Sequence, residues 1–198
     1  MYRLCEQVGA VKTWIALLRG INVGGRNRLP MKSLSQILES AGCERVTTYI
    51  QSGNVVFNGN VDSVDRFGDE IGQAIMKEHG FCPAVRLINA DYLAEAIASN
   101  PYPEAASDPK SLHLSFLEHP PRGELVSEAR QLLSESESFT VIGSLLYLHA
   151  PEGIGRSRFA NRVDKALQMK TTGRNWRTVM KLEELVLSER VFAATVRS

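Results

Sequence analysis

The segment Trp14–Ile21, WIALLRGI, limits the folds open to this chain more than any other part of the sequence. Its apolar side chains fall on both alternating faces, and a strand of that kind is typical of a sheet covered on both sides. Pro30 suits the first turn of a helix, apolar residues then recur at helical spacing, and Gly42 suits its C-terminal cap. The sequence therefore predicts a buried strand, a loop and a helix, in that order.

The segment Val46–Asn58, VTTYIQSGNVVFN, reads as two β-rich runs joined across Ser52-Gly53. A two-residue turn at this dipeptide predicts a hairpin in which Gln51 pairs with Asn54. Alternation then predicts two faces, with Thr48, Ile50, Val55 and Phe57 toward a core and Tyr49, Gln51, Asn54 and Val56 on the other side. The amides of the second face could read donors and acceptors of a ligand, or could bond to a neighbouring strand or helix cap.

The element order over residues 13–99 is βαββαβ, the ferredoxin-like arrangement. The turn-rich stretch Asn100–Pro109 is the best candidate for a boundary. The order repeats in part after it, as βαββα with a hairpin across Gly143-Ser144, and a last helix is predicted over Trp176–Leu187. We expect an α+β fold of two ferredoxin-like or related halves, residues 13–99 and 110–190, after an N-terminal extension of residues 1–12.

The composition excludes several classes of protein. The formal net charge is +1, so the chain as a whole is not a polybasic binder, and any anion site must be local. Three cysteines far apart and four histidines outside ligand spacing predict neither a metal nor a disulfide framework, and we expect no cofactor. No apolar run approaches ~20 residues, so we expect a cytoplasmic protein without membrane contact.

Four motifs carry a family resemblance: ALLRGINVGG (residues 16–25), TYIQSGNVVF (48–57), YLHAPEGIGRS (147–157) and TTGRNWRTVMKL (171–182). In this order they resemble the bacterial DUF1697 family, a domain of unknown function, from about Thr13 to about Leu185. The resemblance implies an α+β fold of two ferredoxin-like halves in a cytoplasmic protein, and it implies no activity. The longer N-terminus and Tyr102, where phenylalanine is more usual, depart from the family pattern.

The loop after the first strand comes near the phosphate-loop pattern, with four residues between Gly20 and Gly25, and then departs from it. Arg26 and Asn27 occupy the positions where that loop needs a lysine and a hydroxyl, so the pattern does not predict nucleotide hydrolysis. Glycine N–H groups and guanidiniums nevertheless suit an oxyanion. The alternative is a glycine-rich connector with solvated arginines.

Gly-Arg recurs at Gly155-Arg156 and Gly173-Arg174, each just ahead of a predicted helix, where the helix dipole favours anions. Between Arg156 and Lys181 eight basic residues face one acid, Asp164. Such a segment is either a solvated face paired with acids elsewhere or a surface for phosphates.

We therefore expect one ligand-binding crevice, formed by Arg19, Asn22, Arg26, Arg156, Arg174 and Asn175, with Gln51 and Asn54 at its rim. The leading hypothesis is binding of a phosphate-bearing ligand, either a nucleotide or a nucleic acid, and an exposed ferredoxin-like sheet is one known platform for single-stranded RNA. One alternative is an enzyme acting on a small anionic substrate, with His149 or Tyr49 as proton carrier. Another is a protein-interaction domain whose motifs are structural. The sequence leaves the oligomeric state open.

Overall fold

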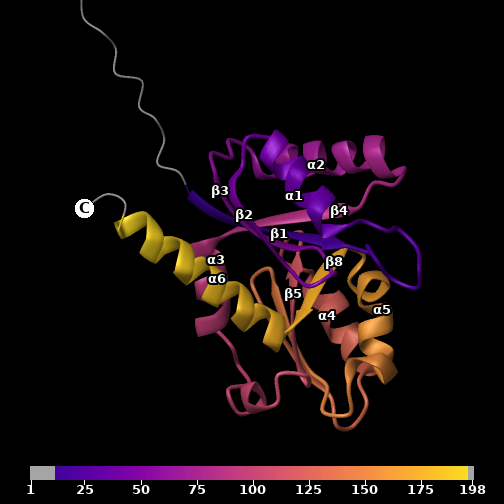
Figure 1. Ribbon diagram of the computed structural model, residues 1–198. Helices are drawn as coiled ribbons and strands as arrows, with labels where there is room; N and C mark the ends of the chain where they lie inside the picture. Colours follow the sequence, from indigo (N-terminus) through magenta and orange to yellow (C-terminus); the bar gives the residue numbers. More distant parts are fainter. Residues whose placement is uncertain (1–11, 196–198) are drawn as a thin grey trace, which may run out of the picture. The chain divides into compact units, whose positions relative to one another are not determined.

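The computed structural model describes residues 12–195, and their side chains as far as Phe192 (Figure 1). The chain forms two compact units. One holds the described residues up to Ala90 together with those from Leu185 onward, and the other is Asp91–Glu184. The helix α3 (Ala90–Ala98) thus lies almost wholly in the second unit, and α6 (Trp176–Thr195) contributes residues to both. The predicted extension, residues 1–12, lies outside the described residues except for Lys12, which begins the first strand.

The first unit is a ferredoxin-like α+β sandwich. Its elements are β1 (Lys12–Arg19), α1 (Met31–Ser40), β2 (Glu44–Tyr49), β3 (Asn54–Gly59), α2 (Val64–His79) and β4 (Ala84–Asn89). The sheet is antiparallel in the order β2-β3-β1-β4, so the strand that is apolar on both faces is central, as predicted. The side chain of Ser63 caps the start of α2, and Gly80 ends it in the left-handed region with φ 78°.

The second unit repeats this arrangement in full. Its elements are β5 (Leu112–Leu117), α4 (Gly123–Ala129), β6 (Ser138–Ile142), β7 (Leu145–His149), α5 (Arg158–Leu167) and β8 (Thr171–Asn175), with short 3-10 helices at Glu104–Ser107, Arg130–Leu132 and Ile154–Arg156. The strand order is β6-β7-β5-β8. The α+β class with ferredoxin-like halves is confirmed, but the prediction of a partial repeat was wrong, because β8 completes it.

A matching hydrogen bond sets the same register in both units. The N–H of Leu18 donates to the carbonyl of Gly53 over 2.8 Å, and the N–H of Leu117 donates to the carbonyl of Ser144 over 2.9 Å. Each bond joins the end of the unit's first strand to the turn of its hairpin. The two residues Leu18 and Leu117 are therefore structurally equivalent, and so are the segments that follow them.

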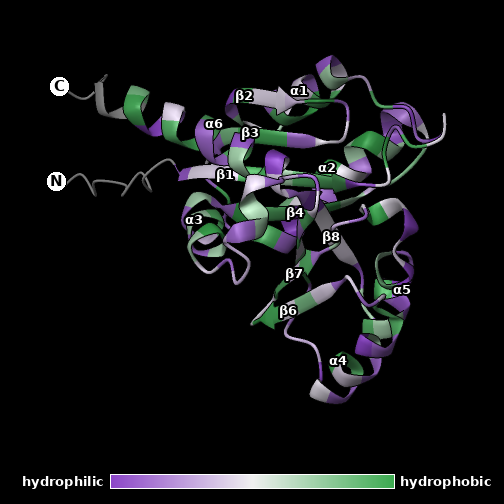
Figure 2. Ribbon diagram, turned by 90° about the horizontal axis from the view of Figure 1, so that it is seen from below, coloured by the Kyte–Doolittle hydropathy of each residue, from purple (hydrophilic) through white to green (hydrophobic). Residues whose placement is uncertain are grey.

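Each unit has its own apolar core on one face of its sheet, where α1 and α2 pack in the first unit and α4 and α5 in the second. Figure 2 shows apolar residues interspersed with hydrophilic ones along the strands and helices. The first core includes Trp14, Ala16, Leu18, Leu34, Leu38, Val55, Phe57, Ile71, Ile75 and Leu87. The second includes Leu117, Leu125, Ala129, Phe139, Leu146, Leu148, Phe159 and Leu167.

The register of the first hairpin differs from the prediction. Tyr49 pairs with Asn54, so four residues rather than two form the turn, and Gln51 lies in it. Ile50 adopts φ 48° and Gly53 adopts φ 73° there. The pairing moved by an even number of residues, so the predicted faces of the strand residues were right, with Val55 and Phe57 in the core. The prediction was wrong for Ile50, which lies in the turn and is 51% exposed instead of facing the core.

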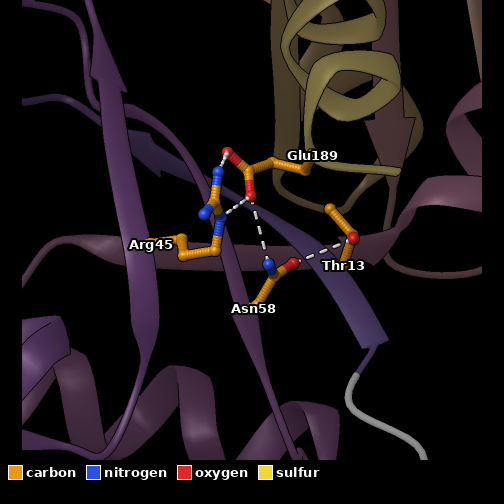
Figure 3. Close-up of polar contacts among 4 residues, drawn as sticks. All are labelled: Thr13, Arg45, Asn58 and Glu189. Atoms are coloured by element: carbon orange, nitrogen blue, oxygen red, sulfur yellow. Dashed lines mark hydrogen bonds and ion pairs between the residues drawn. The ribbon is translucent and has the colours of Figure 1, made fainter. Parts of the chain in front are cut away.

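The opposite face of the first sheet is buried as well. Ile15, Leu17 and Val56 have no exposed surface, so this face is not an exposed sheet of the kind that binds single-stranded RNA in other ferredoxin-like proteins. The end of α6 lies against it. Glu189 accepts hydrogen bonds from Arg45 on β2 and from Asn58 on β3, and Asn58 in turn accepts one from Thr13 (Figure 3).

Candidate functional site

The loop between β1 and α1 is a small β-hairpin rather than a phosphate cradle. The N–H of Arg26 donates to the carbonyl of Val23 over 3.0 Å, and the two residues form an isolated antiparallel bridge. Gly24 and Gly25 between them both have positive φ, 57° and 76°, which is the type I′ turn that favours glycine at both central positions. In both ribbon views this Gly-Arg hairpin, residues 20–29, reaches away from the strands of its unit (Figures 1 and 2).

The side chain of Asn22 holds the base of the Gly-Arg hairpin. Its amide nitrogen donates to the carbonyl of Leu29 over 3.0 Å and to the carbonyl of Gln51 over 2.8 Å, and its oxygen accepts from the N–H of Leu29 over 2.9 Å. Asn27 adds a bond from its side chain to the carbonyl of Gly20 over 2.9 Å. Both asparagines adopt positive φ, which asparagine tolerates better than most residues. Asn22 is thus a positioning residue, and its amide is occupied.

The hairpin turn of β2 and β3 is also held by an asparagine. Asn54 is fully buried, and its amide donates to the carbonyl of Tyr49 over 3.1 Å and to the hydroxyl of Ser52 over 2.9 Å. Asn54 therefore stabilises the four-residue turn, and its side chain is not exposed at the rim of a ligand-binding crevice as predicted. Gln51 keeps an exposed side chain. The structure therefore joins this turn to the Gly-Arg hairpin through the bond from Asn22.

The arginines at this end of the first unit differ in whether their side chains interact with other residues of the protein. Arg19, at the end of β1, is half-buried and makes an interaction of its own. Arg26 and Arg28, on the Gly-Arg hairpin, are exposed, and neither guanidinium has an ion pair among residues 12–195. These two arginines, with Val23 at 66% exposure beside them, are the side chains that the Gly-Arg hairpin offers to a ligand.

The second unit carries the remaining predicted residues. Asn175 caps α6, since its side-chain oxygen accepts from the N–H of Thr178 over 2.9 Å. Arg174 precedes it on β8 and donates to the carbonyl of Gly173 over 2.9 Å, and burial lowers the pKa of Arg174 to about 10, which leaves it charged at neutral pH. Arg156 is exposed in the short helix before α5. Arg174 and Asn175 project from opposite faces of their strand because they are consecutive.

The structure thus links Arg19, Asn22, Arg26, Gln51 and Asn54 to two joined segments at one end of the first sheet. Their convergence with Arg156, Arg174 and Asn175 stays a prediction. Among the described residues no group of three or more histidine, cysteine or acidic side chains could hold a metal ion. No helix in that part of the chain is long and apolar enough to cross a membrane.

The sequence analysis missed one polar cluster, in the first unit. The hydroxyl of Ser33 on α1 lies 2.7 Å from Oε1 of Glu78 and 2.6 Å from Nε2 of His79, both at the end of α2. Glu78 Oε1 also lies 3.3 Å from the same Nε2. A catalytic triad needs the acid behind the ring, at Nδ1, so this cluster joins two helices rather than activating the serine. Ser33 lies 45 residues from Glu78 and 46 from His79 in sequence, so no spacing rule brings it together with them.

Comparison with known proteins gives the family. The sequence pattern of a family described as "Protein of unknown function (DUF1697)" matches residues 11–147, most of the chain. The chain belongs to the DUF1697 family. Its match ends inside β7, so the motifs of residues 147–157 and 171–182 lie almost wholly beyond it. No protein of curated function matches this DUF1697 chain.

A solved structure agrees on the fold. The conserved bacterial protein SP0830 from Streptococcus pneumoniae is 22% identical in sequence, with a TM-score of 0.65. The similarity covers 89% of this chain and 99% of that one. At this identity it shows a shared fold and carries no statement about activity.

Proposed function

We propose that this DUF1697 protein binds a phosphate-bearing polymer, a nucleic acid, through its Gly-Arg hairpin. The observation that carries the proposal is an exposed hairpin, fixed by side-chain hydrogen bonds at its base, that presents Arg26 and Arg28 without ion pairs among the described residues. Guanidiniums donate to phosphate oxygens in pairs, and a hairpin already fixed in shape loses little entropy on binding.

The internal repeat supports a role beyond folding. The first strand of each unit ends at equivalent residues, Leu18 and Leu117. In the second unit the short segment Glu118–Arg122 then leads into α4, whereas in the first unit the residues from Arg19 to Pro30, including the whole hairpin, lead into α1. The same topology therefore forms without the hairpin, and five residues at positive φ within it, from Gly20 to Asn27, are more than a connector needs.

The shape of the hairpin favours a polymer over a small ligand. A projecting turn cannot enclose a small molecule, but it can lie against a row of phosphates or enter a groove of a duplex. In this proposal Arg19, Gln51, Arg156 and Arg174 contribute further contacts, while Asn22, Asn54 and Asn175 hold the segments that carry them. A cytoplasmic location fits the same proposal.

The test is fluorescence anisotropy with labelled 20-nucleotide single-stranded RNA, single-stranded DNA and duplex DNA at several salt concentrations. We expect affinity to fall as salt rises, because binding releases counterions. The double variant Arg26→Ala/Arg28→Ala should lose at least about tenfold in affinity, which is ~0.7 kcal/mol for each arginine. The matched control Lys12→Ala/Lys77→Ala removes two exposed cations of the same unit that have no ion pair among the described residues, and it should bind almost as the wild type does.

Equal losses in both double variants would mean that general charge, and not the hairpin, attracts the polymer. Absence of binding to all three probes at low salt would reject the proposal. That result would favour the alternative of an enzyme that acts on a small anionic substrate. The groove between α1 and α2, which Glu78 lines beside the Ser33 cluster, would then be the first candidate for its substrate site.

A further inference from the structure

The second unit contains a groove of about 430 Å³ between α4 and α5, and none of the predicted site residues lines it. Both ribbon views place these two helices side by side (Figures 1 and 2). The lining residues are Leu125, Glu128, Leu132, Arg162, Lys165, Ala166 and Gln168. Three of them are apolar, and Leu125 and Ala166 pack into the core of the unit, so the floor of the groove is fixed. A volume of this order is in the range of small-molecule sites.

The α5 wall of the groove is basic, with Arg162 and Lys165 lining it. Arg158, Arg162 and Lys165 recur at helical spacing on the exposed side of α5, and none has an ion pair among the described residues. The one acid of this helix, Asp164, is committed elsewhere, because its Oδ1 accepts from the N–H and the hydroxyl of Thr171 over 3.1 and 2.9 Å. Three of the eight basic residues noted in the sequence therefore lie on one exposed side of α5.

The opposite wall and the end of the groove carry different chemistry. Glu128 on α4 is exposed and offers a carboxylate acceptor across from the cations. Gln168 ends α5, and its side-chain oxygen accepts from Arg122 over 3.3 Å, which fixes the amide at the end of the groove. The groove thus presents cations on one wall, an acceptor on the other and apolar carbon between them.

We propose that this groove binds a nucleoside monophosphate. The phosphate group, with a charge near −2 at neutral pH, would lie on Arg162 and Lys165. The base would cover Leu125, Leu132 and Ala166, with an exocyclic amino group donating to Glu128. Inorganic phosphate would make no contact with the apolar floor, and a nucleoside without a phosphate group would make no ion pair with Arg162 and Lys165. This site goes beyond the proposed nucleic-acid contact, because it lies in the other unit and takes a small ligand.

The experiment is isothermal titration of the full chain with adenosine monophosphate, adenosine and inorganic phosphate. We expect the monophosphate to bind at least about tenfold more tightly than either fragment. Arg162→Ala/Lys165→Ala should abolish binding by removing the cations, and Ala166→Leu should weaken it by filling the floor without changing charge. The control Lys110→Ala/Arg177→Ala removes two exposed cations of the same unit that do not line the groove, and it should bind as the wild type does.

Equal affinity for inorganic phosphate and the monophosphate would overturn the proposal, and so would monophosphate binding that survives both groove variants. Circular dichroism of each variant establishes that it is folded, and the exposed positions of Arg162 and Lys165 make that pair the decisive one. Failure here is distinct from failure of the hairpin proposal, since Arg26→Ala/Arg28→Ala leaves this groove intact.

Discussion

The side-chain amide of Asn22 donates to the backbone carbonyl of Gln51 over 2.8 Å, and this bond joins the Gly-Arg hairpin to the turn between β2 and β3. The partners are 29 residues apart in sequence. Because the same side chain also makes two bonds to Leu29, the hairpin and the turn should move as one piece. A rigid base is what allows exposed arginines at a tip to meet a ligand without a large loss of entropy.

Replacing Asn22 tests that joint. Asn22→Ala removes three hydrogen bonds and places a less tolerant residue at φ 54°, so we expect a loss of about 2 kcal/mol in the free energy of unfolding. Asn22→Asp keeps the acceptor for Leu29 but loses both donations, and it should also be destabilised. Urea denaturation of the three proteins measures this, and wild-type stability in Asn22→Ala would show that the bonds do not hold the loop.

Position 53 requires glycine for two reasons: a side chain there would clash with its neighbours, and the backbone is in the left-handed region. A Cβ at this position would lie 2.6 Å from Cβ of Leu18 and 2.9 Å from Cδ1 of Ile21, in a backbone at φ 73°. We expect Gly53→Ala to cost about 3 kcal/mol, the sum of overpacking and left-handed strain. Gly143→Ala, in the equivalent hairpin at φ 56° with no atom near its Cβ, is the matched control and should cost about 1 kcal/mol. Similar losses in both variants would contradict this reading.

Glu189 fastens the end of α6 to the first unit. It is buried, it pairs with Arg45 and accepts from Asn58, and the guanidinium of Arg45 also lies 3.6 Å from the ring centroid of Phe192. Glu189→Ala should therefore release the helix end, which would be seen as faster amide hydrogen exchange over residues 185–192 with little change in β5 or β7. Glu184→Ala, which breaks the exposed pair with Lys181, should leave that exchange unchanged.

His113 makes the second unit sensitive to acid. Its ring is buried with Nδ1 unpartnered, and desolvation lowers its pKa below the ordinary value, although a hydrogen bond to the Ser111 backbone opposes this. The unfolded chain therefore binds the proton more readily, so this stability is present above about pH 6.5 and is lost as the pH falls below it. The free energy of unfolding of His113→Gln should fall less steeply than that of the wild type between pH 7 and pH 5.

The sequence predicted best those strands and helices in which apolar residues recur at the expected spacing along the whole element. β1 and α5 are examples, because one is apolar on both faces and the other strongly amphipathic. β8 was missed because TTGRN has no alternation of apolar residues, and it pairs only with β5 at the edge of the sheet. Gly173 fits there because Ser115 lies where its side chain would be. Edge strands of this kind are set by their neighbours rather than by their own pattern.

The sequence predicted the kind of segment that forms the candidate site, but not the role of each residue in it. Glycine and arginine indicated an exposed loop, and Arg26 is exposed. The roles of Asn22 and Asn54 could not be predicted. An asparagine that binds a ligand and one that stabilises a turn occur in similar local sequences, rich in glycine and polar residues. The two roles differ in where the nearest carbonyls lie. The carbonyls of Gln51 and Tyr49 are placed by a four-residue turn, whereas the sequence predicted a two-residue turn.

The attachment of Glu189 to β2 and β3 has a consequence for biosynthesis. A ribosome makes the strands of the N-terminal sheet long before it makes the helix end that supplies this carboxylate. Until then Arg45 and Asn58 lack their native acceptor, and the nascent N-terminal fold must persist without it. Translation stopping short of residue 189 would leave both units nearly complete in sequence while the earlier one lacked its final support.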